Sequence, residues 1–67
     1  MMEILVNGQP QQVDRNTTVA KLLSALEIQP RYVAVEVNLE LVPRTCHDQR
    51  QLVEGDQLEI VTLVGGG

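Results

Sequence analysis

Residues 2–8 read MEILVNG, and this stretch indicates how the chain begins to fold. Every second side chain is apolar, which is the period of a strand with one buried face. The residues assigned to that face are Met2, Ile4 and Val6. Asn7-Gly8 follows, and both residue types tolerate the positive φ angles of a two-residue hairpin. A second strand at about 9–14 should therefore pair back on the first, and its polar sequence with Pro10 is typical of a sheet edge.

A short amphipathic helix is predicted next. Thr17 or Thr18 supplies a hydroxyl that can cap its first turn. Apolar residues then recur at i, i+3, i+4 and i+7 and form one stripe, made of Val19, Leu22, Leu23 and Leu26. Because a proline disfavours helical angles in the residue before it, Pro30 is expected to end the helix near Glu27 or Ile28.

The rest of the chain predicts two further alternating strands, at 33–37 and 57–63. Weaker patterns between them indicate a turn at 38–40, a short strand at 41–42, an irregular polar stretch at 44–51 and a turn at 54–56. This order favours an α+β fold with a mixed sheet of four to five strands packed on one helix. The expected organisation is one domain over residues 1–63 followed by a flexible tail at 64–67.

One helix covers only one face of such a sheet, so the other face is expected to be open. The alternation assigns seven side chains to it: Glu3, Leu5, Ala34, Glu36, Glu59, Val61 and Leu63. The apolar members should form a patch rimmed by carboxylates, which is typical of a protein-binding surface. A slip of the last strand by one residue would reverse its inward and outward assignments.

The chain ends in Val64-Gly65-Gly66-Gly67. Glycine loses much backbone entropy on ordering and has no side chain to pack, so these residues are expected to form a thin, flexible tail. Four extended residues span about 13 Å at about 3.3 Å per residue, enough to enter another protein's active site. A glycine run alone would also fit a frayed end, but its place directly after a strand favours a reactive tail. The carboxylate of Gly67 would need activation, for example as an acyl adenylate made with ATP, before a sulfur nucleophile could attack it.

Amino-acid composition narrows the classes of molecule that this chain is expected to bind. Nine acidic residues against five basic ones give the 67-residue chain a net charge of −4, and Tyr32 is its one aromatic residue. Nucleic acid is therefore disfavoured, and a protein with a basic surface is favoured. Neither a signal-peptide pattern nor an apolar run of membrane-spanning length is found, so a cytoplasmic protein without a membrane partner is expected.

Cys46-His47-Asp48 resembles a nucleophile, a base and an orienting acid. Neighbouring side chains on one loop point in different directions, whereas catalytic triads assemble from separate parts of a fold. One cysteine and one histidine are also fewer than the ligands that zinc takes from proteins. No catalytic residue and no metal site are therefore predicted, and the loop is expected to carry a half-exposed thiol.

Six segments, taken in order and spacing, carry a resemblance over essentially the whole chain: ILVNG (4–8), TVAKLL (18–23), VAVEVN (33–38), VPR (42–44), LVEGD (52–56) and EIVTLVGGG (59–67). Together they are similar to the sulfur carrier proteins of thiamine biosynthesis, a ubiquitin-like family with the β-grasp fold. Members often have glycine where this chain has Leu39, and an aromatic residue in place of His47.

The resemblance implies a carrier and not an enzyme. An adenylyltransferase related to ubiquitin-activating enzymes would adenylate Gly67 with ATP, and sulfur from a cysteine desulfurase would convert it to a thiocarboxylate. Thiazole synthase would accept that sulfur, and the carrier itself would bind no cofactor. Two alternatives share the adenylation step: the small sulfur-carrier subunit of molybdopterin synthase and a ubiquitin-like protein modifier. A β-grasp interaction module with an inert tail is a third.

Overall fold

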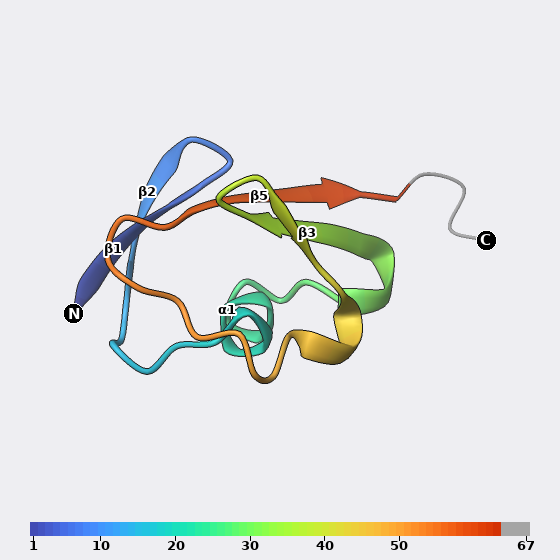
Figure 1. The fold of residues 1–67 in the computed structure, drawn as a ribbon, viewed down its shortest axis with the longest axis horizontal. Coiled ribbons are helices and arrows are strands. Elements are labelled where there is room, and N and C mark those ends of the chain that lie inside the picture. The colour runs from blue at the N-terminus through green and yellow to red at the C-terminus, as the bar shows by residue number, and fades with distance from the viewer. Residues whose placement is uncertain (64–67) are drawn as a thin grey trace.

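The computed structural model describes residues 1–63, and the predicted tail at 64–67 lies outside the described residues. Five strands form one sheet in the order β2-β1-β5-β3-β4, and the helix α1 packs against it (Figure 1). In chain order the elements are β1 (Met2–Val6), β2 (Gln9–Val13), α1 (Val19–Ala25), the 3-10 helix η1 (Pro30–Tyr32), β3 (Val33–Val37), β4 (Glu40–Val42), the 3-10 helix η2 (Arg44–Cys46) and β5 (Gln57–Thr62). The predicted α+β arrangement is confirmed, with β2 at an edge.

The sheet is mixed, because β5 pairs parallel with β1 and antiparallel with β3. β2 pairs antiparallel with β1, and β4 pairs antiparallel with β3. The last strand therefore lies at the centre of the sheet, between the first strand and β3 (Figure 1). The Asn7 side chain extends the contact between β1 and β5, since its Oδ1 accepts from the Ile60 N–H at 2.8 Å.

Both tight hairpins turn through two residues with positive φ. In the β1–β2 turn these are Asn7 (φ 50°) and Gly8 (φ 81°), as the sequence predicted. In the β3–β4 turn they are Asn38 (φ 53°) and Leu39 (φ 69°). The predicted turn at 38–40 is one residue too long, because Glu40 already belongs to β4.

Helix α1 begins where the sequence placed it and ends sooner. Thr18 is the N-cap, and its hydroxyl accepts from the Lys21 N–H at 3.1 Å. The prediction of an end near Glu27 or Ile28 is too late by two to three residues, since the helix stops at Ala25 with Leu26 as its C-cap.

The helix α1 ends early because of the conformation of Glu27, and not because of Pro30. Glu27 has φ 60°, and its N–H donates to the Ser24 carbonyl at 3.0 Å while the Ile28 N–H donates to the Leu23 carbonyl at 2.9 Å. These two bonds are those of a Schellman motif, in which a left-handed residue closes the helix.

The core lies between α1 and one face of the sheet. Its buried members are Met2, Ile4, Val13, Val19, Leu22, Leu23, Val35, Val37, Val42, Leu52 and Leu58. Leu52 comes from the stretch between η2 and β5, which is fastened to the start of the helix. The Val19 N–H donates to the Arg50 carbonyl at 3.0 Å, and the Leu52 N–H donates to the Thr17 carbonyl at 2.9 Å. The polar stretch at 44–51 thus leads into a segment at 50–52 that is bonded to the start of α1 and places Leu52 in the core.

Candidate functional site

The open face of the sheet carries the side chains that the sequence assigned to it. Strand register sets Ala34 opposite Val61, Glu36 opposite Glu59 and Leu5 opposite Gln57. These positions alternate with the buried ones, and α1 covers the other side of the sheet (Figure 1). Val61 and Leu63 are 53% and 48% exposed. The predicted inward and outward assignment of β5 is therefore correct.

The arrangement of carboxylates on this face differs from the predicted rim. Glu36 and Glu59 face each other across the neighbouring strands β3 and β5, in the interior of the sheet. Like charges directly opposite one another are unfavourable in a sheet. None of the five basic residues of the chain lies in a strand, so no Lys or Arg from the sheet compensates this pair.

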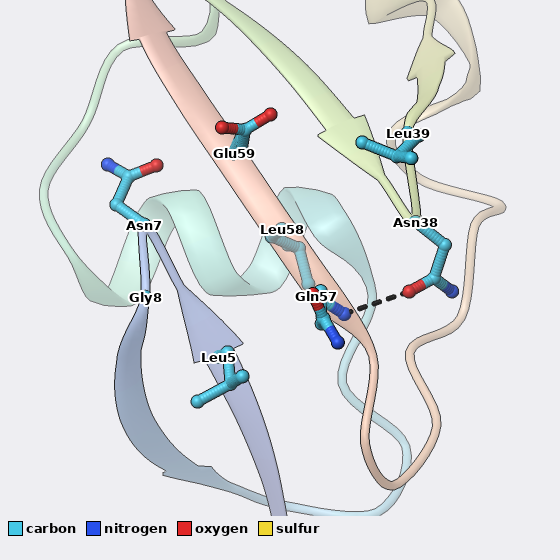
Figure 2. A pocket seen from close by; sticks show the side chains of 8 residues that line it. All are labelled: Leu5, Asn7, Gly8, Asn38, Leu39, Gln57, Leu58 and Glu59. Carbon is cyan, nitrogen blue, oxygen red and sulfur yellow. Dashed lines mark hydrogen bonds between the residues drawn. The ribbon is translucent and has the colours of Figure 1, made fainter.

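A hollow of about 520 Å³ lies beside these carboxylates (Figure 2). The two hairpin turns and the start of β5 form it, and its lining residues are Leu5, Asn7, Gly8, Asn38, Leu39, Gln57, Leu58 and Glu59. Figure 2 shows Leu5 and Leu39 on opposite sides of β5. Leu5 was predicted from the sequence to lie on this face, and Leu39 was not.

Leu41 was also missed. It is 64% exposed and lies opposite Glu36 on the open face. The alternation with Val42, which is buried, could have assigned it to this face.

A polar network fixes the β3–β4 turn to the start of β5. The Gln57 N–H donates to the Asn38 Oδ1 at 3.0 Å, drawn as a dashed line in Figure 2, and Asn38 Nδ2 donates to the Asp56 Oδ1 at 2.9 Å. Asp56 is buried, and its Oδ2 accepts from the Val53 N–H at 2.9 Å. The turn that carries Leu39 is therefore held from its first residue.

The segment Cys46-His47-Asp48 does not form a catalytic arrangement. Cys46 is exposed, whereas His47 is buried with its Nε2 3.2 Å from the Val42 carbonyl oxygen. A carbonyl only accepts, so Nε2 carries the proton there, and Nδ1 has no hydrogen-bond partner among residues 1–63. Within residues 1–63, no cluster of His, Cys, Asp or Glu side chains is suited to hold a metal ion.

The structure carries β5 to Thr62, and Leu63 separates the strand from the predicted reactive tail at 64–67. The Leu63 N–H donates to the Tyr32 carbonyl at 2.8 Å, which fixes the last described residue beside η1. The predicted site residues Val64, Gly65, Gly66 and Gly67 lie outside the described residues. Among the described helices, none has the length and apolar character needed to cross a membrane.

Comparisons with known proteins agree on one family. The model of the ThiS family matches residues 4–67. The sulfur carrier protein ThiS of Escherichia coli is 33% identical over 66 residues, which cover 98% of this chain and 100% of that protein. A crystal structure of the thiamine biosynthesis protein (ThiS) from Geobacter metallireducens is 40% identical and superposes with a TM-score of 0.85, covering 98% of this chain and 100% of that one. This likeness confirms the predicted fold.

A second kind of relative is much longer. A protein named thiazole synthase from Paramagnetospirillum magneticum is 42% identical over 66 residues, which are 98% of this chain and 20% of that protein. A thiazole synthase from Magnetococcus marinus is 41% identical with the same coverage. The chain therefore spans about a fifth of the length of these two relatives.

Proposed function

The chain belongs to the ThiS family, and on this basis we propose that it is a sulfur carrier protein of thiamine biosynthesis whose reactive group is the carboxylate of Gly67. The observation that carries the proposal is the family match, which runs through residue 67 and so includes the glycine run. The carrier is not an enzyme. Its carboxylate is a substrate that other proteins activate and use.

Activation requires a better leaving group than oxide. An adenylyltransferase related to ubiquitin-activating enzymes joins the Gly67 carboxylate to the α-phosphate of ATP, which releases pyrophosphate and gives an acyl adenylate. ATP is bound by that enzyme, and the carrier holds no cofactor. Glycine suits the reaction because the absence of a Cβ leaves the carbonyl carbon open to attack.

Sulfur then replaces the adenylate. The terminal sulfur of a persulfide supplied by a cysteine desulfurase attacks the Gly67 carbonyl carbon, and AMP leaves. The product is an acyl disulfide, whose sulfur–sulfur bond a second thiol cleaves. That thiol supplies the two electrons, is oxidised to a disulfide with the former persulfide thiol, and leaves a thiocarboxylate on Gly67.

Thiazole synthase is the proposed acceptor of this sulfur. Support comes from the two relatives of that name, each of which contains a region similar to almost the whole of this chain. The open face provides the docking surface, formed by Leu5, Glu3, Ala34, Glu36, Glu59, Val61 and Leu63. Docking there lets residues 64–67 reach into the enzyme.

The test is the intact mass of the chain after incubation with the adenylyltransferase, ATP, the cysteine desulfurase and cysteine. We expect a product heavier by the difference between a sulfur and an oxygen atom, mapped to Gly67 by fragmentation. A Cys46→Ser variant is the matched control. In the unaltered chain, the exposed thiol of Cys46 is the other place where sulfur could attach, and a persulfide there would add a whole sulfur atom.

The Cys46→Ser chain should gain the same mass as the unaltered one, and a chain lacking Gly66 and Gly67 should gain none. If the unaltered chain never acquires this mass on Gly67, or takes up sulfur only as a persulfide on Cys46, the proposed function is wrong.

A further inference from the structure

Leu39 combines two features that bring the isolated domain no benefit. It has φ 69°, a left-handed conformation in which a Cβ is unfavourable. Its side chain is 87% exposed, the highest value among the exposed large apolar residues of the described chain. An exposed leucine contributes little to a core, and glycine would fit this backbone better. Strained residues of this kind point to a contact outside the domain.

The turn presents this leucine rigidly. Asn38 makes three bonds that anchor the turn: its N–H donates to the Gln57 carbonyl at 2.7 Å, its Oδ1 accepts from the Gln57 N–H at 3.0 Å, and its Nδ2 donates to Asp56 at 2.9 Å. A group that is already ordered costs less entropy to bind. The turn is therefore pre-organised for docking.

The surroundings of Leu39 define the chemistry of what docks. Leu39 and Leu5 are walls of the hollow on the open face, and Glu59 lines it further along β5 (Figure 2). Glu36 faces Glu59 across the strands, and the sheet contains no Lys or Arg. A complementary surface would combine apolar side chains for the hollow with a basic side chain for the two carboxylates.

We propose that Leu39 is an apolar anchor for thiazole synthase, which covers the hollow with apolar side chains and places a basic side chain against Glu36 and Glu59. This rests on the proposed function. The occupant is thiazole synthase and not the adenylyltransferase because two proteins of that name contain a region like this chain. Enzyme and carrier regions are thus found joined in one chain, where a specific contact between them is favoured by proximity.

The test compares two substitutions that remove the anchor in different ways. Leu39→Gly removes the side chain and the backbone strain, whereas Leu39→Asn removes the apolar side chain and keeps a residue that tolerates a left-handed conformation. Binding of each variant to thiazole synthase from the same organism is measured by titration calorimetry. We expect the dissociation constant of both to rise by roughly tenfold or more, as for an interface hot spot.

Glu27→Gly is the matched control, because it relieves the same left-handed strain at the end of α1, away from the open face. Its binding should equal that of the unaltered chain. Leu39→Gly should also raise the midpoint of thermal unfolding, so its weaker binding would not come from a weaker fold.

Unchanged binding of both Leu39 variants to thiazole synthase would overturn the anchor. The anchor would also be overturned if the Leu39 variants lost binding to the adenylyltransferase alone. Formation of the Gly67 thiocarboxylate is followed in the same variants by mass and should match that of the unaltered chain. Failure of the unaltered chain to form it would count against the proposed function, whereas normal formation with unchanged binding would count against the anchor alone.

Discussion

At the scale of single residues, Asp56 is a buried carboxylate that takes part in holding the rim of the open face. It is 5% exposed, and its two oxygens accept from the Asn38 amide and the Val53 N–H, each at 2.9 Å. Burial of a charge is tolerated when its lone pairs are used in this way. Asp56 therefore links the turn before β5 to the turn that presents Leu39.

Replacing Asp56 with alanine should cost about 2–4 kcal/mol of the free energy of unfolding, since two hydrogen bonds to a charged group are lost. Asp56→Asn should cost less, because one side-chain oxygen can still accept. Urea denaturation measures both values. Glu54→Ala is the matched control, because within the described part of the chain that carboxylate accepts a single exposed bond, from the Glu3 N–H at 3.2 Å. Equal stabilities of Asp56→Ala and Glu54→Ala would contradict this account.

At the scale of elements, α1 illustrates what the sequence could and could not predict. Its start could be predicted because a cap hydroxyl and an apolar stripe are local patterns, and Thr18 and Val19 occupy the expected places. Its end was not, because the left-handed residue that stops it is Glu27 where glycine would be the usual signal.

The same difference explains which parts of the candidate site could be predicted from the sequence. The alternation of β3 and β5 was enough to place Ala34, Glu36, Glu59 and Val61 on one face. The importance of Leu39 depends on its backbone angle, and the facing of Glu36 and Glu59 depends on strand order. The first was hidden because leucine is not a residue type that signals a left-handed turn position, and the second arises from a pairing between distant segments, which no local pattern records.

The conformation of Glu27 predicts a stabilising substitution. Glu27→Gly removes the Cβ from a left-handed position and should raise the free energy of unfolding by about 0.5–1 kcal/mol. Glu27→Ala also removes the charge but keeps the Cβ, so it should bring no comparable gain. Thermal unfolding of the three proteins tests this. A gain for alanine as large as that for glycine would show that charge, and not backbone conformation, is responsible.

At the scale of the whole molecule, no basic residue lies in a strand of the sheet, whereas three carboxylates lie on its open face. The basic residues lie outside the strands, on α1, the 3-10 helices and the connecting segments, whereas Glu3, Glu36 and Glu59 lie on the open face. A net charge of −4 adds a long-range attraction toward a basic partner. The unfavourable pairing of Glu36 with Glu59 indicates that this face is adapted to binding and not to stability alone.

Charge reversal at these positions should therefore separate binding from folding. Glu59→Lys converts the pair with Glu36 into an attraction, so the free energy of unfolding should stay equal or rise by about 0.2–1 kcal/mol. The same change should weaken binding to thiazole synthase. It should also reduce the dependence of the dissociation constant on salt concentration, because a charge contact is lost. Glu3→Lys and Glu36→Lys should weaken binding in the same direction.

The matched control for these reversals is Glu40→Lys, which alters the net charge equally. Glu40 lies in β4 opposite Val37, on the side of the strand that faces away from the open face. If net charge alone attracted the partner, Glu40→Lys would weaken binding as much as Glu59→Lys. If the open face is the docking surface, Glu40→Lys should change binding much less. Unchanged binding in Glu3→Lys, Glu36→Lys and Glu59→Lys alike would exclude this face as the place where thiazole synthase docks.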